Sequence, residues 1–466
     1  MKKTKIICTI GPATAHPDIM TQIVNNGMNV ARINFSHATM EERVSFLESV
    51  KEARKRTGKT VGILYDTKGP DFRTGMLKDN AIDLIEGNQI IITKEDVLGT
   101  QDKITVNYKD ALDDINVGNV ILLEDGLMKL EVVQKNQSEL TCKVINGGQL
   151  GNKKGVNVPG VKLNVPFLSE QDIEDIRYAC QNEGDFLALS FVETKEDLIK
   201  VREILAEENR TDMLIISKVE NQIGIDNIDD IIEYSDGIMI ARGDLGVEVS
   251  MIEIPFLQKM MISKCRRQGK FSIVATEMLA SMYKNARPTR AEATDIANAV
   301  LDGTDVVMLS GETSIGKYPV EAVRYMSEIL EYAEQHFEFQ NEFNKPDTLS
   351  ITEMIAKTVA KSAFKLNAKL IIVPVVSGYS ARKISNLIPL CPILAVCPSE
   401  EVAQKLILNH GVYTTVKEKV SFTEIMDNAK EVAKTFIDVK PKDIIIVAGG
   451  FSGNAKTTNL MKIDEV

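Results

Sequence analysis

The fold is decided by residues 213–246, which read MLIISKVENQIGIDNIDDIIEYSDGIMIARGDLG. The apolar runs at 213–218 and 237–242 are short enough to be buried strands, and the amphipathic stretch at 228–234 between them predicts a helix. A strand, a helix and a second strand at this spacing predict a right-handed unit with parallel strands.

The same alternation extends in both directions along the chain. Amphipathic stretches also precede apolar runs at 186–190, 271–276 and 305–310, and three further runs occur at 5–9, 28–33 and 62–65. Eight strands that alternate with helices predict a (β/α)₈ barrel, although an open sheet would have the same count.

Two segments have a different pattern of apolar and polar residues. Between residues 71 and 165, short alternating runs at 90–93, 120–123, 129–133 and 140–144 are separated by Gly, Asn and Asp, which predicts an inserted small β-barrel domain. After a polar linker at 340–347, strands at 370–375, 393–396 and 444–447 alternate with helices. We therefore predict a barrel at 1–70 and 166–340, an inserted β domain at 71–165 and a C-terminal α/β domain at 348–466.

Composition excludes several classes of protein. The net charge of −11 argues against a nucleic-acid partner. No stretch approaches the roughly 20 apolar residues that cross a bilayer, so no membrane partner is expected. The six cysteines form no CxxC pair, and the apolar run that ends at Ile10 is too short for a signal peptide, so a cytoplasmic location is expected.

Polar residues follow three successive strands, where a barrel carries its reacting groups. Lys218 and Glu220 are two apart and face the same side of one strand, Asp244 follows the next strand, and Thr276 ends the third. Two carboxylates on neighbouring strand ends are suitable ligands for Mg²⁺, and the backbone N–H groups of Gly243 and Asp244 offer a seat for an anion.

Each of these residues also has a structural explanation. Lys218 and Glu220 would form an ion pair, Asp244 would cap a helix, and Thr276 would fill space. Their occurrence together on three strand ends favours a functional site.

A second polar cluster follows the N-terminal strands. Its oxygen-bearing side chains, which would suit a weakly hydrated monovalent cation, are Asn34, Ser36, Asp66 and Thr67. Arg32 and Arg73 are suited to phosphate, since a guanidinium matches phosphate oxygens in a two-pronged fork. A network of helix caps and turns would have the same composition.

One apparent nucleotide motif is rejected. Residues 311–317, GETSIGK, fit the first part of a phosphate-binding loop, but Tyr318 stands where that motif needs a Ser or Thr for Mg²⁺. We interpret this segment as the last loop of the barrel.

Eight segments together resemble the pyruvate kinase family, in the order of that family. They are CTIGPA (8–13), ARINFSH (31–37), DTKGP (66–70), SKVEN (217–221), IMIARGDLG (238–246), ATEML (275–279), RPTRAE (287–292) and MLSGET (308–313). The resemblance implies transfer of the phosphoryl group of phosphoenolpyruvate to ADP in the last step of glycolysis. It also implies that the barrel is catalytic, that the inserted domain at 71–165 is a lid, and that the protein uses Mg²⁺ (or Mn²⁺) and K⁺ as cofactors. Allosteric regulation and a homotetramer are implied as well.

The resemblance also assigns roles to single residues. The catalytic residues would be Lys218, Arg32 and Thr276. Phosphoenolpyruvate would be bound by Arg32, Lys218, Gly243, Asp244 and Thr276, and the nucleotide by Asn34, His37, Arg73 and Lys154. Glu220 and Asp244 would hold Mg²⁺, while Asn34, Ser36, Asp66 and Thr67 would hold K⁺.

The sequence departs from the family pattern at several positions. Asp71 stands where the family usually has Glu, and relatives that do not need K⁺ have Lys there, so the retained carboxylate predicts K⁺ dependence. Glu277 replaces the usual Gln. In the C-terminal domain the loop of Ser377, Gly378 and Ser380, with a second turn from Gly449 to Thr458, resembles a site for a sugar-phosphate or nucleotide effector. Plain turns are the alternative there.

Two other classes of protein remain as hypotheses. A Mg²⁺-dependent lyase or aldolase acting on pyruvate-like acids also binds enolates with paired carboxylates, but it needs neither a lid nor phosphate-binding cations. A sensor of sugar phosphates that has lost catalysis would not need Lys218, Glu220, Asp244 and Thr276 together.

Overall fold

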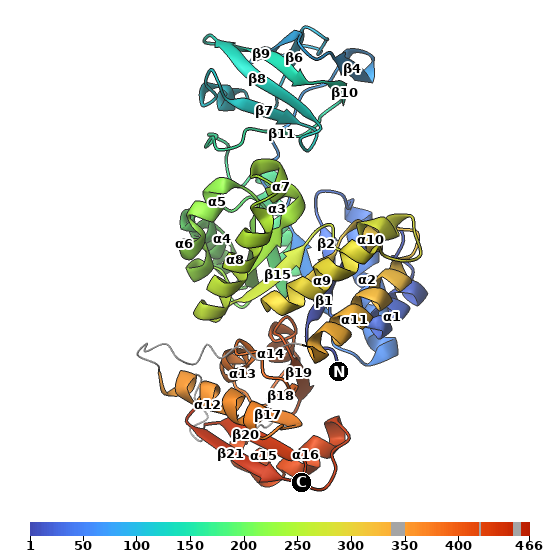
Figure 1. Cartoon of the computed structure of the whole chain (residues 1–466), viewed down its shortest axis with the longest axis vertical. Coiled ribbons are helices and arrows are strands. Elements are labelled where there is room, and N and C mark those ends of the chain that lie inside the picture. The colour runs from blue at the N-terminus through green and yellow to red at the C-terminus, as the bar shows by residue number, and fades with distance from the viewer. Residues whose placement is uncertain (337–349, 419–420, 451–457) are drawn as a thin grey trace.

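The computed structural model of the chain describes residues 1–336, 350–418, 421–450 and 458–466. Three units follow one another along the longest axis, with the inserted lid at one end, the barrel in the middle and the C-terminal domain at the other end (Figure 1). The predicted linker at 340–347 and most of the second effector turn, at 451–457, lie outside the described residues.

The middle unit is a closed barrel of eight parallel strands, as predicted. In spatial order its strands are β1 (Lys5–Thr9), β16 (Val306–Leu309), β15 (Phe271–Ala275), β14 (Gly237–Ala241), β13 (Leu214–Val219), β12 (Phe186–Leu189), β3 (Gly62–Asp66) and β2 (Val30–Asn34). Closure between β1 and β2 excludes the open sheet. The strands are buried on both faces, which explains their almost continuous apolar runs.

Helices surround the barrel and follow its strands in sequence. They are α1 (Pro17–Asn26), α2 (Met40–Thr57), α3 (Glu170–Gln181), α4 (Lys195–Glu207), α6 (Ile228–Tyr234), α8 (Ile254–Gln268), α9 (Arg290–Asp302) and α11 (Pro319–Gln335), with the short helices α5 (Gln222–Asp226), α7 (Arg242–Glu248) and α10 (Gly311–Ser314) in loops. Thr39 and Thr289 begin α2 and α9 with reciprocal capping bonds to Glu42 and Glu292. Residues 311–314 form α10 in the loop after β16, as interpreted from the sequence.

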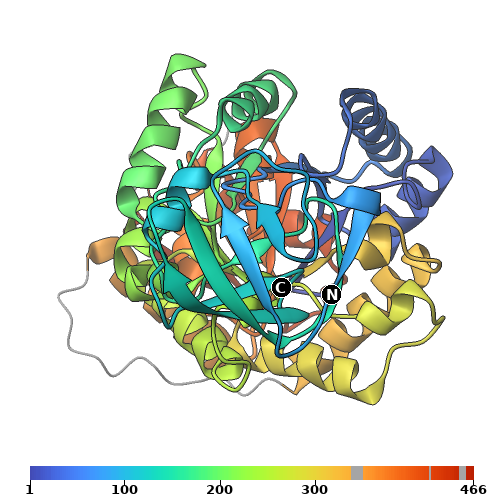
Figure 2. The ribbon, with the colours of Figure 1, turned by 90° about the horizontal axis from the view of Figure 1, so that it is seen from above.

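The inserted lid has a core of its own. Its larger sheet, in spatial order, contains β11 (Val156–Asn157), β7 (Val120–Leu123), β8 (Met128–Lys135), β9 (Glu139–Asn146), β5 (Gln89–Thr93) and β6 (Lys103–Thr105), and β10 (Gly148–Gly151) pairs with β4 (Ala81–Leu84). Alternate residues of β8 are buried, because one face of the strand packs on the core of the lid. Seen from above, the lid lies over the barrel (Figure 2).

The C-terminal domain is a five-stranded sheet between two layers of helices. Its strands, in spatial order, are β19 (Val412–Val416), β18 (Ile393–Cys397), β17 (Leu370–Pro374), β20 (Ile444–Gly449) and the antiparallel β21 (Leu460–Glu465). Its helices are α12 (Ile351–Lys365), α13 (Tyr379–Ser385), α14 (Glu400–Lys405), α15 (Phe422–Asp427) and α16 (Ala429–Phe436). Separate apolar clusters cover the two faces of the sheet.

The first residues of the chain join the barrel to this domain. Glu334, 6% exposed, accepts hydrogen bonds from the backbone N–H groups of Lys3 and Thr4. Lys5 Nζ donates to the carbonyl oxygen of Val412 at 2.5 Å, and burial lowers the pKa of this lysine to about 8. The N-terminal strand is thus held from both sides. In the described residues, no helix combines the length and the apolar character that crossing a membrane requires.

Candidate functional site

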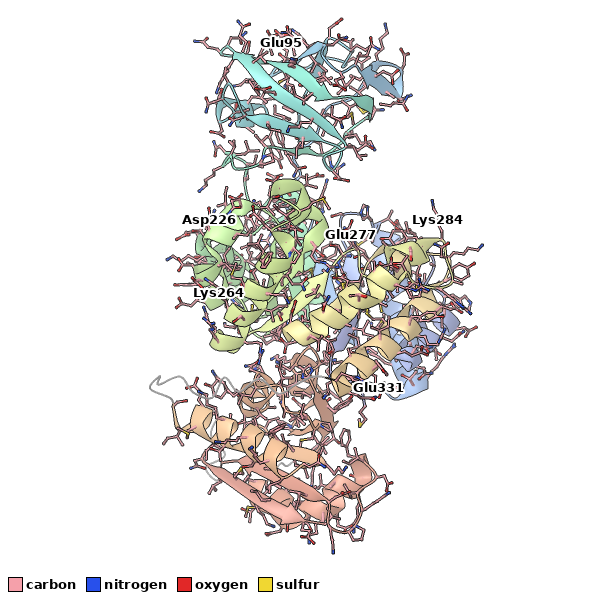
Figure 3. All side chains as sticks on the ribbon, viewed as in Figure 1. Glu95, Asp226, Lys264, Glu277, Lys284 and Glu331 are labelled. Carbon is pink, nitrogen blue, oxygen red and sulfur yellow. The ribbon has the colours of Figure 1, made fainter. Side chains whose placement is uncertain are left out.

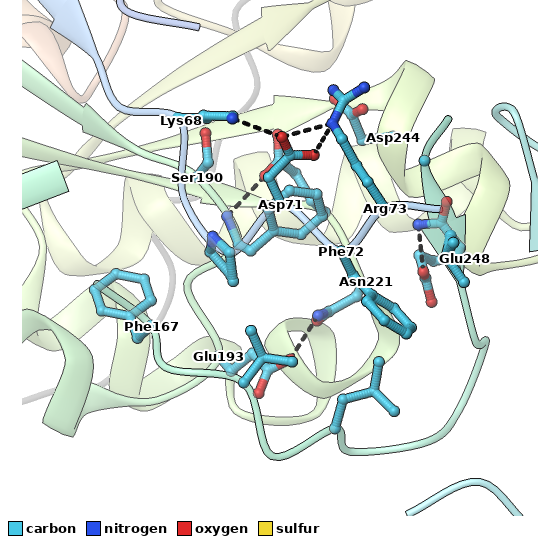
Figure 4. A pocket seen from close by; sticks show the side chains of 18 of the residues that line it. Lys68, Asp71, Phe72, Arg73, Phe167, Ser190, Glu193, Asn221, Asp244 and Glu248 are labelled. Carbon is cyan, nitrogen blue, oxygen red and sulfur yellow. Dashed lines mark hydrogen bonds and ion pairs between the residues drawn. The ribbon is translucent and has the colours of Figure 1, made fainter. Parts of the chain in front are cut away.

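A cavity of about 1270 Å³ lies where the carboxyl ends of the barrel strands face the lid. Figure 4 shows that its wall carries side chains of both signs from the barrel and from the lid. Nine predicted residues line it: Arg32, Asn34, Ser36, His37, Arg73, Lys154, Lys218, Glu220 and Asp244. Asp66, Thr67, Gly243 and Thr276 do not line the cavity, although the first two contact residues that do.

Lys218, near the end of β13, is a buried cation among oxygen atoms. Its Nζ lies 3.1 Å from Glu220 Oε1, 3.2 Å from Asp66 Oδ1 and 2.6 Å from Ser190 Oγ. Burial has the largest effect on its pKa and lowers it, but the Asp66 and Glu220 carboxylates together outweigh burial and raise the pKa above its ordinary value. Lys218 therefore stays charged at the floor of the cavity.

Asp66 ends β3 and holds two cations in place. Its Oδ2 lies 2.7 Å from Arg32 Nε, and Arg32 Nη1 donates to Thr9 Oγ1 at 2.8 Å. Burial alone would raise the pKa of Asp66, but Lys218 and Arg32 outweigh it and hold the pKa below its usual value. An ionised Asp66 thus orients Lys218 and Arg32 toward the cavity.

Glu220 and Asp244 both line the cavity, and the charge of Asp244 acts on the carboxyl group of Glu220. Glu220 is 1% exposed, and its Oε2 accepts the Phe191 N–H at 2.7 Å. Burial raises the pKa of Glu220, Lys218 opposes this, and Asp244 raises it further. Mutual repulsion of two hard oxygen ligands at a cavity fits a divalent cation such as Mg²⁺. Within the described residues, no three His, Cys, Asp or Glu side chains cluster as metal ligands.

Thr276 has a left-handed backbone, with φ of 68°, and Glu277 follows with φ of 56°. Such conformations cost of order 1–3 kcal/mol each and persist only where the surroundings hold them. Here Thr276 Oγ1 accepts the Gly243 N–H at 2.7 Å, and Arg242 Nη2 donates to the Thr276 carbonyl oxygen at 2.8 Å. Glu277 is exposed on the outside of this turn (Figure 3). The loop after β15 is thereby fixed to the start of α7.

The oxygen-bearing residues of the second cluster lie on neighbouring strand ends. Asn34 and Asp66 are opposite each other in the β2–β3 register, and Thr67 directly follows Asp66. Asn34 Oδ1 accepts the Ser36 N–H at 3.0 Å, which keeps these two residues together. Amide, carboxylate and hydroxyl oxygens are the types of donor that suit a monovalent cation, and here they lie on neighbouring strand ends.

Two of the predicted nucleotide contacts, Arg73 and Lys154, are paired with carboxylates. Asp71 lies 2.5 Å from Arg73 Nε and 2.9 Å from Lys68 Nζ, and Lys154 Nζ lies 2.6 Å from Glu124 on the lid (Figure 4). These cations are partly exposed, so each pair contributes little energy and a phosphate group can displace the carboxylate. His37 lines the cavity beside them.

Three further residues of the cavity were not predicted from the sequence. Ser190 bonds Lys218, Lys68 bonds Asp71, and Lys162 enters the cavity wall from the segment that leads back from the lid. Ser190 and Lys68 follow strands β12 and β3. They could therefore have been predicted from the rule that the reacting groups of a barrel follow its strands.

The predicted effector residues lie in the C-terminal domain and do not line the cavity. Gly378, with φ of 82°, precedes α13, and Arg382 Nη2 donates to the Ser377 carbonyl oxygen at 3.2 Å. The hydroxyl groups of Ser380 and Thr458 are hydrogen-bonded, so Thr458 lies beside the start of α13.

The fold and the cavity define a (β/α)₈-barrel enzyme with a lid over its active-site end. Comparison with known proteins is specific: the model "Pyruvate kinase, barrel domain" matches residues 1–323, and "Pyruvate kinase, alpha/beta domain" matches residues 353–464. The chain therefore belongs to the pyruvate kinase family and is a phosphotransferase, as the resemblance of its motifs implied.

Individual relatives agree with the family models over the whole chain. Pyruvate kinases of Bacillus licheniformis and Geobacillus stearothermophilus are 47% and 46% identical, over 99% of this chain and 80% of theirs. A crystal structure of a pyruvate kinase from Cryptosporidium parvum matches with a TM-score of 0.95 at 39% identity, covering 100% of this chain and 96% of that one.

Proposed function

We propose that the protein transfers the phosphoryl group of phosphoenolpyruvate to ADP, forming pyruvate and ATP in the last step of glycolysis. The observation that carries this proposal is the buried Lys218 cation, held between Asp66 and Glu220 at the floor of a cavity that Asp244 also lines. Phosphoryl transfer needs positioning and neutralisation of charge more than covalent chemistry, and this arrangement is suited to both.

The chain's own cations neutralise the transferring group. Lys218 and Arg32 contact the phosphoryl oxygens, and Asp66 keeps both cations aimed at them. Glu220 and Asp244 would hold Mg²⁺ or Mn²⁺, which supplies further neutralisation of oxygen charge when bound. Asn34, Ser36, Asp66 and Thr67 would hold K⁺.

The two substrates occupy different walls of the cavity. Gly243, Asp244 and Thr276 bind phosphoenolpyruvate and the enolate that it leaves, next to Lys218 and Arg32. Asn34, His37, Arg73 and Lys154 bind the nucleotide, with Arg73 and Lys154 exchanging their carboxylate partners for phosphate oxygens.

The function is tested by pyruvate formation from phosphoenolpyruvate and ADP in Mg²⁺, with and without K⁺. We expect strong turnover with K⁺ and a loss of about tenfold or more without K⁺ and Na⁺, because Asp71 keeps a carboxylate where a lysine would replace the missing positive charge. The matched variant Asp71→Lys should reduce the dependence on K⁺.

Two outcomes would contradict parts of this proposal. Full activity without K⁺ would remove the cation site but leave the reaction intact. No turnover at all, even with sugar phosphates and AMP added, would favour the lyase or the sensor.

We also propose allosteric activation by a sugar phosphate or nucleotide bound at Ser377, Gly378 and Ser380. The approach of Ser380 to Thr458 supports this, because hydroxyl groups of two segments meet beside a turn. A panel of sugar phosphates and AMP should contain a compound that lowers the phosphoenolpyruvate concentration for half-maximal rate. Ser380→Asp should abolish the response by repelling phosphate, whereas Thr435→Asp, on exposed α16, should retain it. An equal response in both variants would place the effector elsewhere.

Further proposals concern organisation. Domain boundaries at 70/71 and 165/166 are supported by the lid core, which runs from Phe72 to Val158.

A homotetramer is supported by the apolar side chains of Met251, Ile252 and Phe256, which are 78%, 79% and 73% exposed. Sedimentation velocity would contradict the homotetramer by finding a monomer. A cytoplasmic location is supported by six free cysteines and is tested by cell fractionation.

A further inference from the structure

Helix α7 joins the substrate site to the lid. Its first turn carries Gly243 and Asp244, and its last turn carries Val247 and Glu248. With seven residues and a rise of about 1.5 Å per residue, it spans roughly 10 Å as a single rigid element. A displacement at one end is therefore carried to the other.

The last turn of α7 makes a direct hydrogen bond to the lid. Glu248 Oε1 accepts from Asn157 Nδ2 at 2.7 Å, and Asn157 belongs to β11, where it pairs with Leu122 of β7. Figure 4 shows Glu248 with this bond at the edge of the cavity. The bond connects the central sheet of the lid to the helix that carries Asp244.

Another part of the lid lies near α7 at Val247. A Cβ atom placed on Gly126, in the turn between β7 and β8, would lie 3.8 Å from Val247 Cγ1. The turn has a defined shape, because Glu124, Asp125 and Gly126 have φ values of 50°, 55° and 81°. Two neighbouring residues of α7 thus face two separate parts of the lid.

The charge of Glu248 has no evident structural purpose. Burial raises the pKa of this carboxyl, the Asn157 hydrogen bond lowers it, and nearby Glu193 raises it again. No cation in the described parts of the chain forms an ion pair with Glu248. A partly buried carboxylate without a cation is costly, but a hydrogen bond to an ionised acceptor is roughly twice as strong as one between neutral groups.

The other end of α7 is anchored to the barrel. Gly243 N–H donates to Thr276 Oγ1, and Arg242 Nη1 lies 2.8 Å from Asp295 of α9. The helix is therefore fixed to the barrel at its first turn and bonded to the lid at its last.

We propose that Glu248 is a positioning residue whose bond to Asn157 couples the orientation of the lid to the placement of Gly243 and Asp244. This inference rests on the proposed function, since it assigns these two residues to the phosphoenolpyruvate and metal site. Binding of the nucleotide at Arg73 and Lys154, which the lid carries, is then transmitted through α7 to the other substrate.

A double-mutant cycle of Asn157→Ala and Glu248→Ala tests the coupling. Each single change should lower kcat about fivefold or more, and the double variant should be no worse than either, because both remove the same bond. Glu248→Gln, which keeps an acceptor oxygen but loses the charge, should have an intermediate kcat. Asn146→Ala is the matched control, since its amide donates at 2.7 Å to Leu127 O within the lid, and it should leave kcat unchanged.

A second readout does not depend on turnover. The chain has no tryptophan, so Leu127→Trp, at a position 66% exposed in the turn that faces α7, would introduce a single tryptophan that can be excited apart from the ten tyrosines. Phosphoenolpyruvate with Mg²⁺ but no ADP should shift its emission, and the shift should disappear when Asn157→Ala is added. Independent, multiplicative losses of kcat, or an emission shift that survives Asn157→Ala, would overturn the proposal. An emission shift in a protein that forms no pyruvate would instead refute the proposed reaction while supporting the coupling.

Discussion

Replacing Lys218 by Met lowers kcat for pyruvate formation by at least about 1,000-fold, the scale on which a single cation acts in phosphoryl transfer. Methionine matches the length of the lysine stem but leaves the transferring group without its buried positive charge. It also leaves Asp66 and Glu220 without the cation that lies 3.2 and 3.1 Å from them. The measurement is the steady-state rate at saturating phosphoenolpyruvate, ADP, Mg²⁺ and K⁺.

The control for this variant is another lysine of the same cavity. Lys200 lines the cavity from α4 and is exposed, so Lys200→Met should retain kcat within about twofold. Circular dichroism and thermal unfolding separate loss of chemistry from loss of the fold, because the variant leaves the buried Glu220 without a cation, while Asp66 keeps only Arg32, and both changes destabilise the barrel. A folded Lys218→Met variant that keeps a tenth of the wild-type kcat would refute the catalytic role.

Replacing Glu220 by Gln has the second-largest expected effect. The amide is nearly isosteric and can still accept the Phe191 N–H, so the loop after β12 should stay in place. Removing one of two carboxylates leaves Asp244 as the single charged ligand, and we expect the Mg²⁺ concentration for half-maximal rate to rise about 100-fold. The measurement is a Mg²⁺ titration at fixed phosphoenolpyruvate and ADP.

Glu193→Gln is the matched control for this titration. Glu193 is also a partly buried carboxylate of the cavity wall, with a pKa raised by burial, but it accepts a hydrogen bond from Asn221 instead of lying beside Asp244. Its Mg²⁺ dependence should match the wild type. Equal shifts in the two variants would mean that general negative charge, and not the pair of Glu220 and Asp244, attracts the cation.

The barrel was predictable because each of its strands is buried on both faces and therefore appears in the sequence as an apolar run. Strands β19 and β21 were missed for the opposite reason. The sequences VYTTV and LMKIDE place partly exposed and polar residues between apolar ones, and both strands lie at the edges of their sheet. Edge strands carry less of the burial that pattern analysis detects.

The site was predictable only in part. Lys218 and Glu220 could be placed on one side of a strand because they are two residues apart. Thr9, which supports Arg32, lies within the segment CTIGPA but was not predicted as a site residue, and the bond between Asn157 and Glu248 joins residues 91 apart with no shared periodicity. Contacts between loops of different units depend on the docked geometry, which local pattern does not encode.

The pairing of Lys5 with Val306 has a consequence for biosynthesis. The first strand made is completed only by the last strand of the barrel, about three hundred residues later, which at about 5–20 residues per second takes roughly 15–60 s on the ribosome. Until then one edge of β1 and the apolar barrel interior are open to other chains. The lid, with its separate core, can fold during that interval, so the nascent chain should depend on chaperones mainly for its barrel.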